Sequence, residues 1–301
     1  MEKDNCIICL DSNIKKITNY INTTPLFEQQ HIYQCNNCFG YFSYFKKNKN
    51  ELKKYYTNTA SSSIGKKSGY LSNIFAKSVS ITRKNYIKKN LKKLNKFNFK
   101  NILEIGPGSG HLFQEFNTNE YNRFDAVEED TSLHPMLLNQ NIKLIKYEEL
   151  INDNYNFIIL SHVLEHIIHP YIFLDEIVKK LKSEGIIFID VPCEDWKYKN
   201  QYEPHLTFFN KESLCMISKK FSLDIISLDY VGDDIKKIKL LFENKLIYQL
   251  RSILCFFKSI ITTLPYISKE KLFIKYYNYL YNLDYINNNK SRWLRCILQK
   301  K

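Results

Sequence analysis

Short apolar runs alternate with helical segments between residues 101 and 192, and no other feature limits the possible folds as strongly. The apolar runs cover residues 101–105, 123–129, 141–147, 156–161 and 185–192. Short apolar strands that alternate with helices predict a parallel sheet with helices on both faces. A sheet of this kind binds its ligand at the carboxyl ends of its strands.

The same pattern continues on both sides of this region. We expect helices at 51–56, 71–94, 111–116, 171–182 and 211–220, with the polar stretch 57–69 as a break and Ser183-Glu184-Gly185 ending the helix at 171–182. A sixth strand is expected at 221–231, and 293–301 is expected to return to the sheet edge as a last strand.

The first predicted strand runs into a glycine-rich turn. The segment NILEIGPGSGHLF places Glu104 before Gly106, Gly108 and Gly110. Glycine is needed where a backbone approaches a ligand closely or adopts a positive φ, although such turns also serve plain strand-to-helix packing. The dinucleotide fingerprint requires a third glycine three positions after the second, where this chain has His111, so the spacing argues against a nicotinamide cofactor.

Acidic residues follow the second predicted strand. Glu128 comes 22 residues after Gly106, about where a carboxylate should bind the ribose hydroxyls of a nucleoside cofactor. The alternative is that residues 128–130 form a solvated acidic turn.

A histidine and a carboxylate lie close together after the fifth predicted strand. The segment QYEPHLTFFNKESL (201–214) contains Glu203 and His205. A histidine beside a carboxylate is suited to accept a proton from a substrate hydroxyl, because its pKa lies near neutrality and the carboxylate can orient it. The alternative is that His205 caps the following helix or packs on Phe208 and Phe209.

Four of the eight cysteines form two Cys-x-x-Cys pairs near the N-terminus. Cys6, Cys9, Cys35 and Cys38 supply four thiolates, which suits tetrahedral Zn²⁺. The zinc would be structural, since four cysteine ligands leave no open position. A redox role is disfavoured because two pairs are present and neither precedes a thioredoxin-like pattern.

Three histidines occur within eight residues, from His162 to His169. They suggest a metal, but no carboxylate or cysteine spacing defines a site there. We therefore expect His162, at the end of a strand, to line a cofactor pocket, and His166 and His169 to be structural.

Charge and hydropathy limit the partners and the location. With 44 Lys+Arg against 31 Asp+Glu the formal net charge is +13, which favours anionic partners but also fits a merely basic surface. We expect a cytoplasmic chain, because no apolar stretch follows a basic start at the N-terminus. The longest apolar region, Leu246–Ile267, is interrupted by polar residues and is not expected to span a membrane.

The motifs together resemble one known family. The turn after Glu104 is similar to the Glu/Asp-x-Gly-x-Gly-x-Gly motif of class I S-adenosylmethionine-dependent methyltransferases. The segment NFIILSHVLEHIIHPYIFLDEI (156–177) resembles a stretch of one methyltransferase group, with Asn156 in place of the usual Asp. Residues 201–214 resemble the Tyr-x-Glu-His and His-x-x-x-Phe stretches of sugar methyltransferases, although Pro204 separates Glu203 from His205. That group also has an N-terminal four-cysteine zinc module.

The resemblance implies a Rossmann-like α/β sheet, mostly parallel with an antiparallel last strand. It implies S-adenosyl-L-methionine as cofactor and adds Glu148, with Glu149 as the alternative, as an acid near the adenine amino group. The implied cofactor-binding residues are Glu104, Gly106, Gly108, Gly110, Glu128, Glu148 and His162. The implied catalytic pair is His205 and Glu203.

The activity implied is O- or N-methylation of a sugar, sugar nucleotide or related small polar metabolite. C-methylation is disfavoured because the chain is too short for the further C-terminal domain of that branch. One alternative is an RNA methyltransferase, although the Asn-Pro-Pro-Tyr-like tetrapeptide of amino-methylating DNA enzymes is absent. The other is a non-catalytic S-adenosylmethionine-binding protein.

We predict five segments along the chain. They are a zinc-binding module (1–46), a helical linker (47–100), the cofactor-binding core (101–232), a helical insertion (233–292) and the last strand (293–301). The insertion interleaves apolar and basic residues, and we weigh three roles for it: a packed lid, a homodimer contact, or an amphipathic face on the anionic inner face of a membrane.

Overall fold

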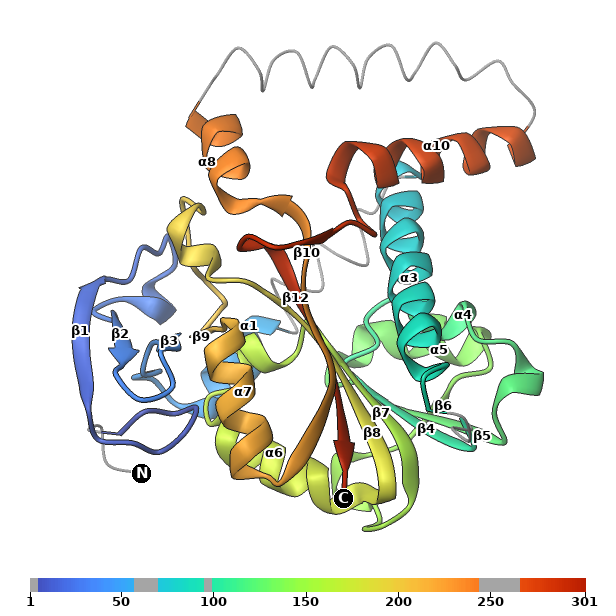
Figure 1. The fold of residues 1–301 in the computed structure, drawn as a ribbon, viewed down its shortest axis with the longest axis horizontal. Coiled ribbons are helices and arrows are strands. Elements are labelled where there is room, and N and C mark those ends of the chain that lie inside the picture. Colours follow the sequence, from blue (N-terminus) through green and yellow to red (C-terminus); the bar gives the residue numbers. More distant parts are fainter. Residues whose placement is uncertain (1–4, 57–69, 95–98, 244–265) are drawn as a thin grey trace.

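A computed structural model describes residues 5–56, 70–94, 99–243 and 266–301. Its centre is an eight-stranded sheet (Figure 1). The order across the sheet is β11 (Ile286–Asn287), β10 (Leu223–Asp234), β12 (Ser291–Lys300), β8 (Leu181–Pro192), β7 (Tyr155–Ser161), β4 (Asn101–Ile105), β5 (Arg123–Val127) and β6 (Lys143–Leu144).

The strands from β8 to β6 are parallel, whereas β12 runs antiparallel to both of its neighbours. This is the mostly parallel, Rossmann-like α/β sheet that the sequence predicted. The expected position of the last strand was wrong, because β12 lies between β8 and β10 and not at an edge.

Helices cover both faces of the sheet, which explains why its strands read as continuous apolar runs. On one face α3 (Tyr70–Leu91) and α4 (His111–Gln114) pack on alternate strand residues such as Phe157 and Phe188. On the other, α6 (Pro170–Lys180) and α7 (Lys211–Lys220) pack on Ile158 and Ile187. The short α5 (His134–Asn139) lies between β5 and β6 in the chain.

One predicted helix end was wrong. The helix expected at 171–182 ends at Lys180, and Leu181 already pairs with Tyr155 as the first residue of β8. Ser183-Glu184-Gly185 therefore lies inside β8, at an irregularity where the register shifts. Glu184 has a φ of +59°, and a Cβ at Gly185 would lie 2.8 Å from the carbonyl oxygen of Lys182, so the chain turns there without leaving the sheet.

A second, smaller sheet contains the N-terminal residues. It is antiparallel, in the order β1 (Ile14–Asn19), β2 (His31–Cys35), β3 (Tyr41–Phe42) and β9 (Thr207–Phe208). Strand β9 belongs to the segment that follows β8, so the N-terminal module completes its sheet with a strand of the core. We call residues 5–46 the cysteine module.

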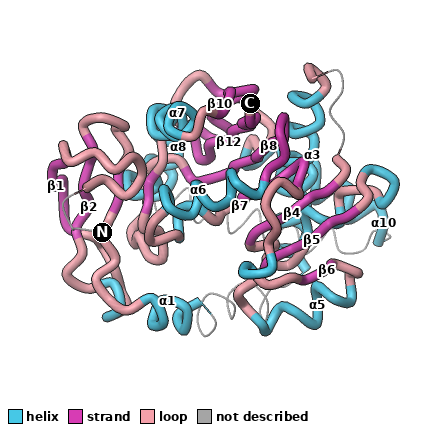
Figure 2. Tube along the Cα trace, turned by 90° about the horizontal axis from the view of Figure 1, so that it is seen from below, coloured by secondary structure: helices cyan, strands magenta, loops and turns pink. Residues whose placement is uncertain are grey.

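Three further α-helices are found among the described residues. Helix α1 (Lys49–Tyr55) follows the cysteine module, and α8 (Ile235–Glu243) and α10 (Tyr266–Tyr281) belong to the expected helical insertion. Figure 2 shows the module and α10 on opposite sides of the large sheet. The predicted break at 57–69 and most of the apolar segment 246–267 lie outside the described residues.

No helix in the described part of the chain is long and apolar enough to cross a lipid bilayer.

Candidate active site

The glycine-rich turn lies at the carboxyl end of β4 and has a conformation that only glycine adopts without strain. Gly106, Gly108 and Gly110 have φ values of +65°, +55° and +72°. At Gly110 a Cβ would lie 2.4 Å from a side-chain oxygen of Gln140, whereas at Gly108 it would meet no atom of the described residues within 4 Å. The turn is therefore packed at its helix end and open at Gly108, where a ligand has room to approach the backbone.

Glu128 joins this turn to the end of β5. Its carboxylate accepts hydrogen bonds from the backbone N–H of Gly108 (3.0 Å) and of Asp130 (2.9 Å). Burial raises the pKa of Glu128, and these two N–H groups partly offset the rise. The half-buried carboxylate therefore stands beside the open side of the turn.

Glu104 is buried one strand away from Glu128. Burial raises the pKa of Glu104 to about 8, against the opposing effect of the Arg83 guanidinium. Among the described residues, no donor lies within hydrogen-bond distance of its Oε2 atom. Arg83 comes from α3 and binds Asp190 of β8, with 2.6 Å between Nε and Oδ2.

The chain leaves β7 through a strained residue. His162 has a φ of +55°, and its backbone N–H donates to the carbonyl of Asp190 (2.8 Å). Such a conformation costs of the order of 1–3 kcal/mol, and it is found mainly at functional sites. The next residue, Val163, reaches the glycine turn, because its Cγ2 would lie 3.1 Å from a Cβ at Gly106. His162 therefore stands beside the glycine turn.

His205 is paired with a carboxylate, but not with the expected one. Its Nδ1 lies 2.7 Å from Oδ2 of Asp195, in the short 3-10 helix η7 (Asp195–Lys197). Burial opposes ionisation of Asp195, but the His205 ring and the Lys199 ammonium hold the pKa of its carboxyl below the usual range. Glu203 instead accepts from the N–H and hydroxyl of Thr23 (2.8 and 2.6 Å). We expected Glu203 to orient His205. This prediction was wrong, because the carboxylate that holds the His205 ring belongs to Asp195.

Two further groups face His205 from the loop after β7. Glu165 and His166 lie in the short 3-10 helix η6 (Leu164–His166), and the rings of His166 and His205 stand 4.8 Å apart. Burial alone would raise the pKa of Glu165, but a hydrogen bond from His162 and the nearby histidines lower it to about 2. Burial lowers the pKa of His166 to about 4.

Glu148 lies away from His205, after β6 at the other end of the large sheet. It is exposed, in the 3-10 helix η5 (Tyr147–Glu149) after β6. Its neighbour in space is Lys53 of α1, which forms an ion pair with Glu129 at 2.6 Å. The geometry leaves Glu128 on the glycine turn and turns Glu129 toward α1.

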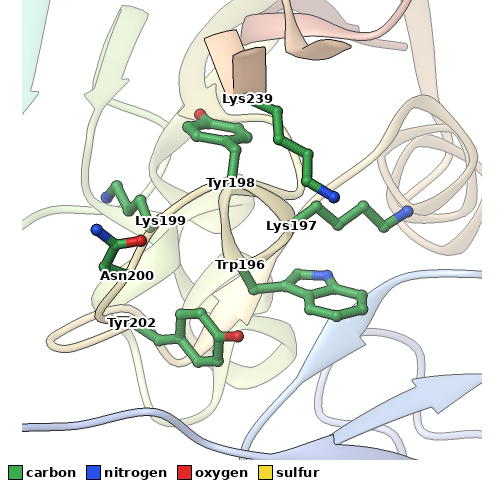
Figure 3. Close-up of a pocket in the computed structure, with 7 residues that line it drawn as sticks. All are labelled: Trp196, Lys197, Tyr198, Lys199, Asn200, Tyr202 and Lys239. Carbon is green, nitrogen blue, oxygen red and sulfur yellow. The ribbon is translucent and has the colours of Figure 1, made fainter. Parts of the chain in front are cut away.

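A cavity of about 210 Å³ adjoins the His205 side of the edge (Figure 3). Two of its lysines are held by buried acids: Lys197 by Glu194 (2.7 Å) and Lys199 by Asp195 (2.6 Å). The lining residues are Trp196, Lys197, Tyr198, Lys199, Asn200, Tyr202 and Lys239. The cavity is thus aromatic and basic, and Asp195 connects it to His205.

The four cysteines converge in the cysteine module. Cys6 and Cys38 have their sulfurs 3.7 Å apart, and those of Cys9 and Cys35 are 3.6 Å apart. All four thiols are buried and free. Zn–S bonds of about 2.3 Å place the sulfurs of a tetrahedral site about 3.8 Å apart, so the residues fit Zn²⁺. Backbone N–H groups also point at the sulfurs, as that of Ile8 does toward Cys6 at 3.4 Å.

Residues 80–228, which include the glycine turn, β7 and His205, match a family model described as a methyltransferase domain. This stretch, just under half of the chain, is therefore similar to a methyltransferase domain, and the similarity supports an enzyme. No curated protein matches the chain.

Several solved methyltransferase structures resemble the protein in fold, at low sequence identity. One is an S-adenosylmethionine-dependent methyltransferase from Archaeoglobus fulgidus, with 16% identity, coverage of 72% of this chain and 94% of that one, and a TM-score of 0.44. The plantazolicin methyltransferase BamL has 12% identity, 83% and 94% coverage and a TM-score of 0.49. The N-methyltransferase NodS of Bradyrhizobium japonicum has 9% identity, 83% and 97% coverage and a TM-score of 0.47.

The fold brings most of the predicted site residues to one edge of the large sheet. The glycine turn, Glu104, Glu128 and His162 lie at the ends of β4, β5 and β7. These features fit S-adenosylmethionine, because Gly108 leaves open space and Glu104 keeps an oxygen without a donor among the described residues.

Sequence reasoning missed Asp195 and Arg83. Asp195 lies ten residues before His205, across a loop with no periodicity, and Arg83 is one of many basic residues on a helix. Neither position carries a local signal. Glu203 was predicted because it is the carboxylate nearest to His205 in the sequence.

Proposed function

We propose that the protein transfers a methyl group from S-adenosylmethionine to an oxygen or nitrogen of a sugar, a sugar nucleotide or a related small polar metabolite. The observation that carries this proposal is the position of the His205–Asp195 pair. His205 faces His166 and Glu165, Glu165 lies 3.0 Å from Nδ1 of His162, and the next residue, Val163, reaches the glycine turn. A cofactor on the turn and an acceptor at His205 would therefore meet at the end of β7.

In this proposal the main role of the residues is to bind the cofactor and the acceptor and to orient them toward each other. Glu128 would hold the ribose, and the open backbone at Gly108 would let the cofactor approach. The bound cofactor supplies a sulfonium methyl group that the acceptor attacks in line. Holding two reactants in register can contribute about 7–11 kcal/mol to the acceleration.

The acceptor side is built for a polar molecule. The cavity beside Asp195 offers lysine and asparagine donors together with the Trp196 and Tyr202 rings. Aromatic faces with polar groups at their edges suit sugar rings, which have apolar faces and hydroxylated rims. This composition supports a sugar-like acceptor and gives no support to a purely apolar one.

The decisive experiment measures methyl transfer from isotopically labelled S-adenosylmethionine to panels of sugars, sugar nucleotides and RNA. We expect label in a sugar-type acceptor. Label in RNA alone would favour the alternative of an RNA methyltransferase. Binding of the cofactor without transfer to any acceptor would leave a non-catalytic binding protein.

The cofactor half is tested separately by calorimetry. We expect Glu128→Ala to weaken S-adenosylmethionine binding by about 1.5–3 kcal/mol, the range for hydrogen bonds to a charged group. Glu129→Ala is the matched control, because Glu129 pairs with Lys53. Equal losses in both variants would contradict the assignment.

We further propose that the insertion is a packed element of a cytoplasmic protein. In its described part, Phe273 and Tyr277 of α10 are buried against Ile74 and Val79 of α3. An apolar face that is covered inside the chain supports packing over membrane attachment. Flotation with anionic liposomes tests this: no flotation at low salt is expected. Salt-sensitive flotation that is lost on deleting residues 233–292 would establish membrane contact. Analytical ultracentrifugation tests the remaining alternative, in which the insertion forms a homodimer contact.

A further inference from the structure

Three side chains that metals favour converge at the carboxyl end of β7, apart from the cysteines. They are Glu165 and His166 of η6 and His205 from the segment before β9. One ligand atom from each lies within 4.8 Å of the others. Two atoms bound to one ion at about 2.1 Å lie at most about 4.2 Å apart, so small side-chain rotations complete the approach.

Each of these side chains keeps an atom that can bind a metal. Asp195 occupies Nδ1 of His205, which leaves Nε2 for a ligand. Nδ1 of His166 is 3.5 Å from the carbonyl oxygen of Pro204, and its Nε2 is 4.0 Å from Oε1 of Glu165. Glu165 is only 1% exposed, and within the described ranges no donor meets its buried Oε2. A buried carboxylate oxygen without a partner is costly, and a cation would remove that cost.

The groups behind the ligands also match a metal site. Metal-binding histidines usually present their second nitrogen to a carboxylate or carbonyl, which fixes the tautomer. Here His205 has Asp195, His166 has the Pro204 carbonyl, and Nδ1 of His162 lies 3.0 Å from Oε1 of Glu165.

We propose that Glu165, His166 and His205 bind one divalent transition-metal ion, whose open positions take the methyl-accepting oxygen. Two imidazoles and one carboxylate suit ions such as Mn²⁺, Fe²⁺ or Zn²⁺, whereas Mg²⁺ and Ca²⁺ prefer oxygen ligands alone. Three protein ligands leave room for substrate, unlike the four thiolates of the cysteine module. This inference rests on the proposed methyl transfer and specifies how its acceptor is held.

In this arrangement His205 is a ligand and not a free base. The ion lowers the pKa of the bound hydroxyl, and its proton leaves to solvent water. The oxygen then forms the O–CH₃ bond while the C–S⁺ bond breaks, and the electron pair stays on sulfur as the neutral thioether. One proton is released for each methyl group transferred, so charge and atoms balance.

The test uses the full-length protein with zinc first supplied to the cysteines. Mn²⁺ is then titrated alone and followed by electron paramagnetic resonance, because Mn²⁺ prefers oxygen and nitrogen ligands to thiolates. We expect about one Mn²⁺ per chain, with spin-echo modulation from two imidazole nitrogens. That modulation is measured on the wild-type protein and does not depend on the folding of a variant.

Variants then locate the ion. Glu165→Gln and His166→Gln should each weaken Mn²⁺ binding at least about 10-fold, and Asp195→Asn about 10–100-fold. His31→Gln, on β2 of the cysteine module, is the matched control and should bind as wild type. Circular dichroism confirms that each variant is folded. Wild-type affinity in folded Glu165→Gln, or no imidazole modulation in the wild type, would overturn the site.

Different results would refute the metal site and the proposed methyl transfer. Mn²⁺ binding at this site without methylation of any polar acceptor would refute the proposed function and keep the metal site. Full methyl transfer by a protein that binds no Mn²⁺, unaffected by EDTA, would refute the metal site and keep the function. Loss of transfer on chelation and recovery with Mn²⁺ would support both.

Discussion

The eight-stranded sheet and the cysteine module lie side by side but are stabilised by different means. Each strand at the centre of the sheet buries apolar residues on both faces, as Phe157 and Ile158 of β7 do. The module has few strands, pairs with β9 of the core at its edge, and buries Ile7 and Ile8 in the core's own cluster. The sheet carries its own hydrophobic core, whereas the module depends on four thiols and on its neighbour.

The difference matters for the candidate active site, because the module holds the segment that carries His205. The hydroxyl of Tyr20 donates to the carbonyl of His205 (2.8 Å), and Thr23 binds Glu203. The Asn210 amide, at the start of α7, donates to the carbonyl of Phe39, beside Cys38 (2.7 Å). A change in the cysteine site therefore reaches the segment that carries His205, while the glycine turn packs on the sheet and on Gln140 after α5, outside the module.

The largest expected effect comes from removing the thiolates. Structural zinc sites in isolated peptides contribute apparent free energies of about 10–16 kcal/mol, so Cys6→Ser with Cys35→Ser should unfold the module. We expect hydrogen exchange to lose protection at residues 6–42 and 202–209 and to keep it at 101–105 and 155–161. Metal analysis of the wild type should find about one Zn²⁺ per chain.

A zinc-free wild type whose melting temperature matches that of the double variant would contradict the structural-zinc proposal. Cys215→Ser, on α7 and outside the cluster, is the matched control.

The sheet should instead respond to pH through Glu104. Its pKa in the folded protein is about 8 and its ordinary value is 4.5, so the folded state holds the proton more tightly. Stability from this group is full below pH 4.5 and is lost as the pH rises to 8. The difference between these two pKa values corresponds to at most roughly 5 kcal/mol in the free energy of unfolding, at about 1.4 kcal/mol per pH unit.

We therefore expect Glu104→Gln to melt at a higher temperature than the wild type at pH 8.5 and at a similar one at pH 4.5. Thermal denaturation of the cofactor-free protein measures this. A constant difference between the two proteins across this range would show that Glu104 is ionised in the folded state.

An intermediate effect is expected at the glycine turn. Gly108 has a positive φ and open space in front of it, so Gly108→Val should weaken S-adenosylmethionine binding at least about 100-fold, or about 2.7 kcal/mol. The fold should persist, because the strain costs only about 1–2 kcal/mol. Gly108→Ala is the control that shares the strain but adds less volume. Unchanged affinity in folded Gly108→Val would exclude the turn as the cofactor site.

The smallest effect tests the link between the two regions. Tyr20→Phe removes the hydroxyl that binds the His205 carbonyl, and we expect a loss of about 1–3 kcal/mol in the free energy of unfolding, since a buried acceptor loses its donor. S-adenosylmethionine affinity should stay unchanged. Tyr33→Phe, on β2 of the same module, should cost less. Equal losses of stability in Tyr20→Phe and Tyr33→Phe would contradict a specific role for the hydrogen bond between Tyr20 and the His205 carbonyl.

Local patterns predicted the elements of the sheet well, because its strands are apolar on both faces. The run 101–105 is β4, and the helix predicted at 211–220 is α7, whose N-cap Asn210 accepts from the N–H of Ser213. The position of β12 was missed, since pairing between distant strands leaves no trace in either strand. The end of α6 was missed because Gly185 serves a strand irregularity and not a helix stop.

The candidate site was less predictable because its groups meet only in the folded chain. The glycine turn is contiguous and was found from spacing alone. Glu165 and His166 were in view, yet the third group, His205, lies 39 residues further on, so no ligand spacing was visible. Asp195 replaced Glu203 for the same reason: the chain between β8 and β9 folds back on itself, and proximity in sequence misleads there.

The position of β12 has a consequence for how the chain is made. Residues 291–300 are synthesised after every other strand, yet they lie between β8 and β10. Until the ribosome has released them, β10 has no strand to join it to the parallel half, and both flanking strands expose backbone groups that invite foreign partners. Until residues 291–300 have been made, the sheet of the nascent protein therefore has a gap between β8 and β10, and a ribosome that stalls near residue 290 would leave a product prone to aggregation.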